Sequence, residues 1–571
     1  MHLRFLVVFV AAIAFIPANA ADRPPAAAIA TAHPLATAAG REMLVAGGNA
    51  FDAAVAVAAA LAVVEPYGSG LGGGGFFLLH RVADGRDVMI DARERAPLAA
   101  RADMYLDADG KPIPRISLDG PLAAAIPGMP AGLAHLAKRY GKLPLTQTLA
   151  PAIQLAREGF AVTALYRRLA GYRRDAMVKW GAGSLFLNGG DIPALGYVVR
   201  QPDLARTLER LARDGGEDFY RGETARRLVD GVRAAGGIWT AADLAQYKIV
   251  EREPLRGTYR GAKIVSAALP SSGGIVLLQA LGLLDGYDLD RLAPIERAHI
   301  VIEAMRRAYR DRAVFMGDPD FIPVDTATKL LDPKHLAQLG ADIDRKRATP
   351  SADLLPSRSP RQSEGTNTTH FSILDAEGNR VAATLSVNTL FGAAFIAPGT
   401  GVLLNNEMDD FAIAPGAPNN YGLVGDAANA IAPGKRPLSS MTPTFIETKD
   451  TVAILGTPGG SRIISMVLLA TLDVVHGRSV ADWVARPRFH HQFLPDRVQY
   501  EPLAFSADVA AALARKGHTL YEVKSGYGNM QALIWNRSGN RVEAASDPRG
   551  EGESVVVPAG SRRQDSAGAA R

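Results

Sequence analysis

Two patterns of hydrophobic and polar residues divide the chain. Residues 36–64 are mostly small and apolar at helical spacing, and the uncharged run 53–64 predicts a buried helix. Residues 130–350 are also predicted to be largely helical, with 296–315 as the clearest example. From residue 368 onward the pattern changes to short alternating strands, in THFSIL, RVAATLSVN, TPTFIE and VAILGT. Helices followed by strands fit either two domains or one α+β sandwich whose alanine-rich helices lie flat on sheets.

A hairpin is predicted at the start of the strand-rich region. The segment before it, 349–367, is rich in proline, serine and charge, as is typical of a linker. If Asp375 and Asn379 close the DAEGN loop symmetrically, Thr368 lies opposite Ser386. Their Cβ atoms would then be about 4.5–5.5 Å apart, within reach of a hydrogen bond. A slip of one residue would turn every side chain to the other face, so the pairing depends on this register.

Thr368 is the better candidate for chemistry of the two adjacent threonines. Thr369 shares a strand face with Phe371 and Ile373, which indicates a structural role. A threonine hydroxyl needs a base, and the chain has no cysteine and no assignable Ser-His-Asp arrangement. Cleavage directly before Thr368 would supply its own α-amino group, whose ordinary pKa of about 7.7–8.0 suits a general base. On these facts alone, an ordinary β-branched strand residue is the favoured interpretation of Thr368.

Later segments add further chemistry. NNEMDDF at 405–411 holds a carboxylate cluster beside amides, and RPLSSMTPT at 436–444 has adjacent serines. GTPGGSR at 456–462 offers glycine N–H groups that could approach a developing oxyanion. The glycine motif that starts at Gly68 follows a helix and precedes a strand, the reverse of a dinucleotide site, so a tight turn is the better interpretation. The HH pair at 490–491 has no metal-ligand spacing around it and indicates a structural role.

Composition narrows the class of protein. Residues 1–20 have a basic start, an apolar core and a small-residue cleavage site, which predicts a signal peptide and export to the periplasm. The apolar core is too short to span a bilayer comfortably, so no membrane anchor is expected. A net charge of +5 spread over 571 residues, without a basic stripe, argues against a nucleic-acid partner. An exported chain with no cysteine must rely on its core for stability.

Taken in order, TNTTHFS, SVNTLFG, NNEMDDF, RPLSSMTPT and GTPGGSR closely resemble the gamma-glutamyltranspeptidases, a family of N-terminal-nucleophile hydrolases. GGNAFDAAVAVAAAL, DARERAP, AAIPGMPAGL, LPSSGG, PRFHHQ and SDPR extend the resemblance over nearly the whole mature chain. It implies a four-layer αββα sandwich, formed as one domain by two chains. The implied chains are a large subunit, 21–367, and a small subunit, 368–571, which form a heterodimer after self-cleavage between Asn367 and Thr368.

The resemblance also implies roles for individual residues. Thr368 would be the processing residue and the nucleophile, and Ser386 would support it. The other implied positions are Gly459 and Gly460 as the oxyanion hole; Arg93, Ser439 and Ser440 for an α-carboxylate; Asn388, Glu407 and Asp410 for an α-ammonium; and Tyr421 in a lid at 415–435. Arg93 is one of two arginines in DARERAP, and a structural ion pair is the plainer interpretation of either. No metal and no cofactor are implied.

Three functions follow as hypotheses. The resemblance favours cleavage of the γ-glutamyl amide of glutathione, with transfer to water or to an amino acid or dipeptide. A cephalosporin or glutaryl acylase of the same superfamily would share the nucleophile but would have less need for an ammonium pocket. A non-catalytic periplasmic binding protein for small amino acids would remain a single unbroken chain.

Overall fold

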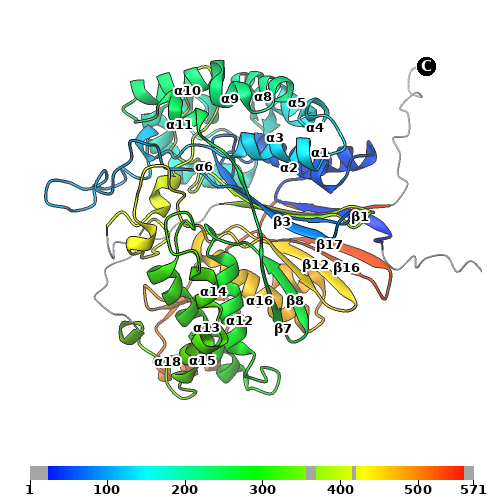
Figure 1. Ribbon diagram of the computed structural model, residues 1–571, viewed down its shortest axis with the longest axis vertical. Coiled ribbons are helices and arrows are strands. Elements are labelled where there is room, and N and C mark those ends of the chain that lie inside the picture. Colours follow the sequence, from blue (N-terminus) through cyan, green and yellow to red (C-terminus); the bar gives the residue numbers. More distant parts are fainter. Residues whose placement is uncertain (1–22, 355–367, 415–418, 559–571) are drawn as a thin grey trace, which may run out of the picture.

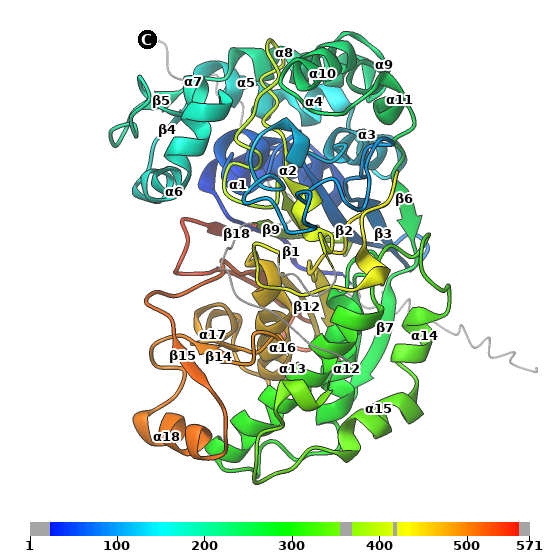
Figure 2. The same cartoon turned by 90° about the vertical axis from the view of Figure 1, so that its left-hand side faces the viewer.

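Two β-sheets lie face to face between two layers of helices (Figure 1). The computed structural model describes residues 23–354, 368–414 and 419–558. Figure 2 shows the same four layers from the side, with the sheets in the middle of the molecule. The predicted αββα sandwich is therefore confirmed.

Strands from before and after the expected cleavage point share both sheets. In spatial order, the seven-stranded sheet contains β18 (Glu553–Pro558), β1 (Ala26–Thr31), β9 (Thr369–Leu374), β10 (Arg380–Ser386), β2 (Gly74–Arg81), β3 (Arg86–Ala92) and β6 (Val250–Arg252). The six-stranded sheet contains β17 (Arg541–Ser546), β16 (Gln531–Asn536), β12 (Thr451–Gly456), β11 (Thr444–Glu447), β8 (Ala262–Ser266) and β7 (Leu255–Tyr259). The helix-rich and strand-rich regions of the sequence thus build one domain.

Successive side chains on the central strands point alternately into two different hydrophobic cores, which explains the layers. On β9, Phe371 and Ile373 join the core beneath the upper helices, whereas Leu374 joins the core between the two sheets. β10 alternates in the same way, with Val381 toward the helices and Ala382 toward the second sheet. Because both faces of these strands are covered, their residues are buried throughout.

The helices divide between the two outer layers. The upper layer in Figure 1 contains α1 (Pro34–Val45), α2 (Ala50–Val64), α3 (Met129–Arg139), α4 (Leu145–Thr148), α5 (Ala150–Glu158), α6 (Ala164–Trp180), α8 (Pro202–Asp214), α9 (Glu217–Arg221), α10 (Glu223–Ala234) and α11 (Ala241–Ala245). The lower layer includes α12 (Gly273–Leu284), α13 (Pro294–Phe315), α14 (Thr326–Leu330), α15 (Pro333–Ala341), α16 (Ile463–Val475) and α18 (Ala507–Arg515). Shorter elements are α7 (Gly183–Phe186), α17 (Val480–Ala485), β4 (Phe160–Ala161), β5 (Val198–Val199), β13 (Phe489–His490), β14 (Val498–Tyr500) and β15 (Leu520–Glu522).

Helix α2 shows why small residues matter here. Every residue of α2 is buried, and Asn49 and Asp52 form a capping box at its start. A Cβ atom on Gly40 of α1 would lie 2.6 Å from Val57 Cγ2, so the two helices can approach closely only with glycine at this position. The buried helix predicted over 53–64 is confirmed.

Most element predictions are confirmed. The helix predicted over 296–315 is α13, and the four predicted strands are β9, β10, β11 and β12. The region 130–350 is less uniformly helical than predicted, because β6, β7 and β8 occupy most of 250–266. Strands of three to five residues are too short to establish a clear period of two in the sequence. The predicted signal peptide, Asn367 and most of the predicted linker lie outside the described residues.

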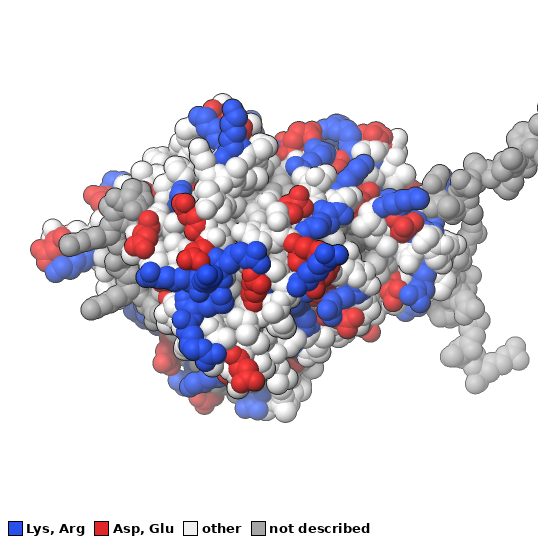
Figure 3. Space-filling model, turned by 90° about the horizontal axis from the view of Figure 1, so that it is seen from below, with Lys and Arg blue, Asp and Glu red and all other residues white. Residues whose placement is uncertain are grey.

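Two further observations concern the surface. Among the described residues, no helix is both long and apolar enough to cross a bilayer. On the face seen from below in Figure 3, a group of basic side chains lies near the middle, and acidic side chains border it on several sides. That face therefore carries no continuous stripe of one charge.

Candidate active site

Thr368 lies at the open end of the β9–β10 hairpin. Leu374 pairs with Arg380 and Thr369 pairs with Leu385, which confirms the predicted register. Continued by one residue, this register places Thr368 opposite Ser386. Both residues line the same small cavity.

The glycine-rich loop before β2 supports this end of the hairpin. A Cβ atom on Gly73 would lie 2.0 Å from the carbonyl oxygen of Ser386. A Cβ atom on Gly68 would lie 3.6 Å from both the Thr368 carbonyl oxygen and Glu65 Oε2. The loop therefore passes directly behind the threonine and serine, which confirms the tight turn predicted there.

A cavity on one side of Thr368, here called the inner cavity, brings together nearly all the residues that the sequence singled out. Its free volume is about 20 Å³, enough for roughly one water molecule. Leu423, Met441, Ser461 and Ile463 complete the lining. The predicted residues in its wall are Arg93, Thr368, Ser386, Asn388, Glu407, Asp410, Tyr421, Ser439, Ser440 and Gly460.

Arg93 is the cation of the inner cavity. Its guanidinium group is buried and forms ion pairs with Glu407 and with Asp410, and its Nε donates to the Pro437 carbonyl at 3.1 Å. Arg95 lies elsewhere and donates to the Gly434 carbonyl at 2.7 Å. The structure therefore brings the first arginine of DARERAP, not the second, to the cavity.

Burial and ion pairing act against each other in this cluster. Burial raises the pKa of Glu407 well above its usual range, and the nearby Arg93 guanidinium offsets part of that effect. Burial alone would lower the pKa of Arg93, but Glu407, Asp410 and Glu94 raise it above its usual value. Glu94 is buried 4.0 Å from Arg93, and burial raises its pKa to about 7. Three acidic groups therefore surround the Arg93 guanidinium group, and burial favours the neutral form of each of them.

The two serines lie on a turn held by a second segment. Ser439 N–H donates to the Pro270 carbonyl at 2.8 Å, and Ser272 Oγ donates to the Ser439 carbonyl at 2.7 Å. Arg312 of α13 donates to Ser440 Oγ at 3.1 Å, which adds a second guanidinium group beside the cavity. Sequence reasoning missed Arg312 because it lies within the regular pattern of a long helix.

Gly459 and Gly460 follow β12 and precede α16. Their φ angles are +143° and +57°, in the region that favours glycine. Among the described residues, neither amide N–H has a recorded hydrogen-bond acceptor. Gly460 lines the inner cavity and Gly459 a neighbouring one, and Thr368 lines both. The geometry is suited to holding an oxyanion formed at Thr368.

Tyr421, predicted to lie in a lid, lines the inner cavity. The Tyr421 hydroxyl group donates to the Asn388 carbonyl at 2.6 Å. The Tyr421 carbonyl accepts a hydrogen bond from Gln492 Nε2 at 3.1 Å. A Cβ atom on Gly460 would lie 2.4 Å from the Tyr421 ring, so ring and glycine are packed together. Residues 419–435 of the predicted lid are described and 415–418 are not.

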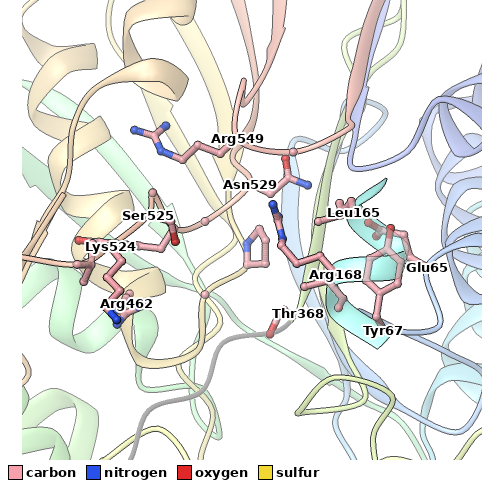
Figure 4. A pocket seen from close by; sticks show the side chains of 18 of the residues that line it. Glu65, Tyr67, Leu165, Arg168, Thr368, Arg462, Lys524, Ser525, Asn529 and Arg549 are labelled. Carbon is pink, nitrogen blue, oxygen red and sulfur yellow. The ribbon is translucent and has the colours of Figure 1, made fainter. Parts of the chain in front are cut away.

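A second cavity, here called the outer cavity, also has Thr368 in its lining and measures about 350 Å³. Figure 4 shows Thr368 at its base, with Glu65, Tyr67 and Arg168 on one wall and Arg462 and Lys524 on the other. Of the residues that the structure describes, four basic ones and one carboxylate, Glu65, line it. The basic residues are Arg168, Arg462, Lys524 and Arg549. No sequence motif indicated this second cavity.

Glu65 lies in the wall of the outer cavity. It accepts a hydrogen bond from Thr369 Oγ1 at 2.6 Å, which gives Thr369 the structural role predicted for it. Burial raises the pKa of Glu65 to about 7, against the opposing effect of the Thr369 and Tyr67 hydroxyl groups. A lone carboxylate directly after the apolar run 53–64 was the available sequence signal for this residue.

The buried histidines near the site have structural partners. His370 contacts Thr384 Oγ1 at 2.8 Å, and His490 contacts Ser465 Oγ at 2.6 Å. Burial lowers the pKa of both rings to about 3, so both are neutral at physiological pH. The structural role predicted for the pair at 490–491 fits these contacts.

Within the part of the chain that the structure describes, one group of residues has ligand atoms close enough for a metal ion, namely His299, Glu303 and His518. His299 Nδ1 lies 2.7 Å from His518 Nε2, and its Nε2 lies 2.7 Å from the Asp344 carbonyl. Glu303 forms ion pairs with Arg306 and Arg307. If both imidazole rings are neutral, His518 can donate to His299 and His299 can donate to the Asp344 carbonyl. These hydrogen bonds account for the short contacts without an ion.

Comparison with known proteins agrees with this geometry. A family model described as Gamma-glutamyltranspeptidase matches residues 36–557. The chain belongs to the gamma-glutamyltranspeptidase family. A glutathione hydrolase proenzyme from Pseudomonas sp. (strain A14) is 44% identical over 513 residues, which cover 87% of this chain and 88% of that protein. The glutathione hydrolase proenzyme of Escherichia coli (strain K12) is 41% identical and covers 91% and 90%.

Proteins of similar structure include one with a different activity. The crystal structure of a cephalosporin acylase from Bacillus halodurans matches with a TM-score of 0.82 and 28% identity. The match covers 96% of this chain and 99% of that chain. The fold is thus common to gamma-glutamyltranspeptidases and acylases, and the side chains of the inner cavity must distinguish between them.

Proposed function

We propose that this protein is a self-processing γ-glutamyl hydrolase and transferase that acts on glutathione and related γ-glutamyl amides. The observation that carries the proposal is the inner cavity, where Thr368 shares a wall with one guanidinium group and two carboxylates. A free amino acid head is a zwitterion, and this pair of opposite charges matches it.

Binding requires an exchange of partners in the inner cavity. Arg93 with Ser439 and Ser440 would hold the α-carboxylate, and Asn388, Glu407 and Asp410 would receive the α-ammonium. Since Arg93 is now paired with Glu407 and Asp410, the substrate must insert its two charges between these side chains. Each protein charge then keeps a partner of opposite sign, so the exchange leaves no buried charge unpaired.

Thr368 would carry the acyl group. After cleavage between Asn367 and Thr368, its α-amino group takes the proton from its hydroxyl group as Oγ attacks the γ-carbonyl carbon. Amides of Gly459 and Gly460 would hold the resulting oxyanion, and the loss of one such donor costs about 10²–10³ in rate. As the intermediate collapses, the C–N bond breaks, the proton passes to the leaving amine and a γ-glutamyl ester of Thr368 remains.

The second half of the reaction reverses these steps. Water or an acceptor amine attacks the ester carbonyl and gives up a proton to the α-amino group. The C–Oγ bond then breaks, and Oγ recovers the proton. Ser386 would orient the nucleophile, because the hairpin register places it opposite Thr368. Attack by water gives hydrolysis, and attack by an amino acid or dipeptide gives transfer.

Processing and location are part of the same proposal. The mature enzyme would be a heterodimer of a large subunit, 21–367, and a small subunit, 368–571, exported to the periplasm by the signal peptide at 1–20. Both sheets contain strands from both subunits, which supports a heterodimer that stays assembled after cleavage. The smaller fragment of active protein should have the N-terminal sequence Thr-Thr-His-Phe, which N-terminal sequencing can test. A full-length single chain with activity would contradict the proposal, and one without activity would fit a binding protein.

Substrate class is tested with a matched pair of chromogenic donors. γ-Glutamyl-p-nitroanilide and glutaryl-p-nitroanilide differ only in the α-ammonium group that Glu407 and Asp410 would receive. We expect the purified enzyme to prefer the γ-glutamyl compound by at least about 10²-fold in kcat/KM, since hydrogen bonds to a charged group contribute about 1.5–3 kcal/mol each. A preference for the glutaryl compound would instead identify an acylase and leave the fold unchanged.

A further inference from the structure

Arg312 of α13 is an exception among the buried arginines of this protein. The part of the chain that the structure describes contains eight buried arginines, and seven of them form an ion pair with a carboxylate. The seven are Arg93, Arg173, Arg306, Arg307, Arg380, Arg436 and Arg488. Arg312 is 5% exposed, and no ion pair between it and another described residue is recorded. A buried charge without a partner of opposite sign is costly, so an anion from outside the protein would stabilise Arg312.

The Arg312 guanidinium group is nevertheless charged. Burial lowers the pKa of Arg312 to about 10, and the nearby Asp410 carboxylate opposes this effect. At neutral pH the group therefore keeps its proton and its positive charge. Its recorded hydrogen bonds go to hydroxyl groups: Nε donates to Ser272 Oγ at 2.9 Å, and Nη2 donates to Ser440 Oγ at 3.1 Å.

These two hydrogen bonds decide where the serine protons point. A guanidinium group donates and never accepts, so each serine oxygen accepts from Arg312 and keeps its own proton to donate elsewhere. Ser272 donates its proton to the Ser439 carbonyl at 2.7 Å. Ser440 lines the inner cavity, and no hydrogen bond from its hydroxyl group to a described residue is recorded. Ser439 Oγ accepts from the Met441 amide at 3.1 Å and lines the same cavity. Both hydroxyl groups can therefore donate to an acceptor in the inner cavity.

We infer that Arg312 is a positioning residue for the α-carboxylate of the substrate, because it directs the Ser440 proton into the inner cavity and places an unpaired positive charge behind it. The inference rests on the proposed function and adds a residue that favours the carboxylate without contacting it. Arg312 does not line the inner cavity, so its effect passes through Ser440 and, by way of Ser272, through the turn that carries Ser439.

A double-mutant cycle tests the connection between Arg312 and Ser440. Arg312→Lys keeps the charge but lacks the planar group that holds two oxygens at once. Ser440→Ala removes the hydroxyl group through which Arg312 acts. We expect each change to raise KM for γ-glutamyl-p-nitroanilide about tenfold and to alter kcat by less than about twofold, as for a lost hydrogen bond to a charged group. In the Ser440→Ala background, Arg312→Lys should raise KM by no more than about threefold further, because its main route is already absent.

Two competitive inhibitors show whether the α-carboxylate is the group concerned. 4-Aminobutyrate is L-glutamate without its α-carboxylate. Arg312→Lys should weaken inhibition by glutamate about tenfold and inhibition by 4-aminobutyrate less than about twofold. A general disturbance of the fold would weaken both alike. Arg310→Lys is the control on the same helix, because Arg310 pairs with Asp311 and lines neither cavity. It should leave both inhibition constants unchanged.

All variants are compared as processed protein, which gives two fragments on a denaturing gel. If Arg312→Lys is not processed, Ser272→Ala tests the same connection, because it removes the oxygen that holds Arg312 Nε. It should weaken inhibition by glutamate about threefold and leave inhibition by 4-aminobutyrate unchanged.

Two results would overturn the inference while hydrolysis of γ-glutamyl-p-nitroanilide upheld the proposed function. One is equal weakening of both inhibitors in the variant that is processed. The other is a double variant in which the separate effects of Arg312→Lys and Ser440→Ala on KM multiply in full. Failure of the unaltered enzyme to hydrolyse any γ-glutamyl donor would overturn both the inference and the proposed function.

Discussion

The inner and outer cavities meet at Thr368 but handle charge in opposite ways. In the inner cavity Arg93 is buried against Glu407 and Asp410, so each charge has a partner within the protein. In the outer cavity Arg168 and Lys524 face solvent with no recorded ion pair among the described residues. Buried charges must be compensated at all times, whereas exposed charges can remain unpaired at little cost. The inner cavity is therefore suited to strict selection of one head group, and the outer cavity to weak attraction of anionic groups.

The largest effect should come from the residue that the two cavities share. Thr368→Ala removes the hydroxyl group that attacks the peptide bond in processing and accepts the acyl group in catalysis. We therefore expect an unprocessed single chain with no γ-glutamyl hydrolase activity. Denaturing gel electrophoresis and release of p-nitroaniline measure the two results. Thr368→Ser is the matched control, because it keeps a hydroxyl group and should still be processed. A Thr368→Ala protein that is cleaved at the same bond would remove Thr368 from processing.

A second prediction concerns the ammonium-binding side of the inner cavity. Asp410→Asn keeps the shape but removes a negative charge that pairs with Arg93. We expect kcat/KM for γ-glutamyl-p-nitroanilide to fall about 10²-fold, since hydrogen bonds to charged groups contribute about 1.5–3 kcal/mol. The fall for the glutaryl compound, which has no ammonium group, should be much smaller.

Asp409→Asn is the control for this variant. Asp409 is the neighbouring buried carboxyl, but it accepts from Ser117 Oγ at 2.7 Å and does not line the inner cavity. Its substitution should leave the ratio between the γ-glutamyl and glutaryl compounds near the unaltered value. If Asp410→Asn lowers activity on both compounds equally, Asp410 does not receive the substrate ammonium.

The sequence predicts the inner cavity much better than the outer one. Thr368 and Ser386 could be paired because a short symmetrical loop fixes the register of their strands. Glu407, Asp410, Ser439 and Ser440 lie in irregular polar segments, which stand out against a chain of helices and strands. Their assembly around Arg93, more than 300 positions earlier, was implied by resemblance and not by any local pattern.

The outer cavity could not be predicted in this way. Arg168 and Lys524 are more than 350 positions apart, and each is one of many surface cations. Only the close packing of the two sheets brings α6 and the segment after β15 to one opening. Arg312 was missed for the same reason, because a buried arginine inside α13 has no distinctive sequence pattern. What the sequence lacks is tertiary placement, which depends on the whole fold.

A third prediction concerns Glu65, the carboxylate among the described residues that line the outer cavity. Its recorded hydrogen bond comes from the Thr369 hydroxyl group and not from a cation. Burial raises the pKa of Glu65 to about 7 from an ordinary value of 4.5. Between these two values the folded protein binds a proton that the unfolded chain does not, so the Glu65 contribution to stability falls as pH rises. Glu65→Gln removes this dependence and keeps an acceptor for Thr369 Oγ1.

We therefore expect the free energy of unfolding of Glu65→Gln, relative to the unaltered residue, to rise by up to about 3 kcal/mol between pH 4.5 and 7.5. The comparison is best made in the unprocessed Thr368→Ala background, so that chain cleavage does not differ. Urea unfolding followed by tryptophan fluorescence at several pH values gives the measurement. Parallel stability curves for the two proteins would show that Glu65 titrates near its ordinary pKa.

The smallest effect should come from a change at Tyr421, the predicted lid residue that lines the inner cavity. Tyr421→Phe removes the hydroxyl group that donates to the Asn388 carbonyl at 2.6 Å but keeps the ring that packs on Gly460. A single neutral hydrogen bond contributes about 1 kcal/mol, so we expect KM for γ-glutamyl-p-nitroanilide to rise about fivefold with little change in kcat.

Tyr421→Ala provides the comparison, because it removes the ring as well and opens the inner cavity to solvent. It should raise KM further and also lower kcat, since water would then weaken the electrostatic contacts around the substrate. Tyr197→Phe, at an exposed position, controls for loss of a tyrosine hydroxyl group as such. If Tyr421→Phe behaves like Tyr421→Ala, the hydrogen bond to Asn388 holds the cover closed. If it behaves like the unaltered enzyme, packing of the ring on Gly460 is sufficient, and the inner cavity is closed by shape.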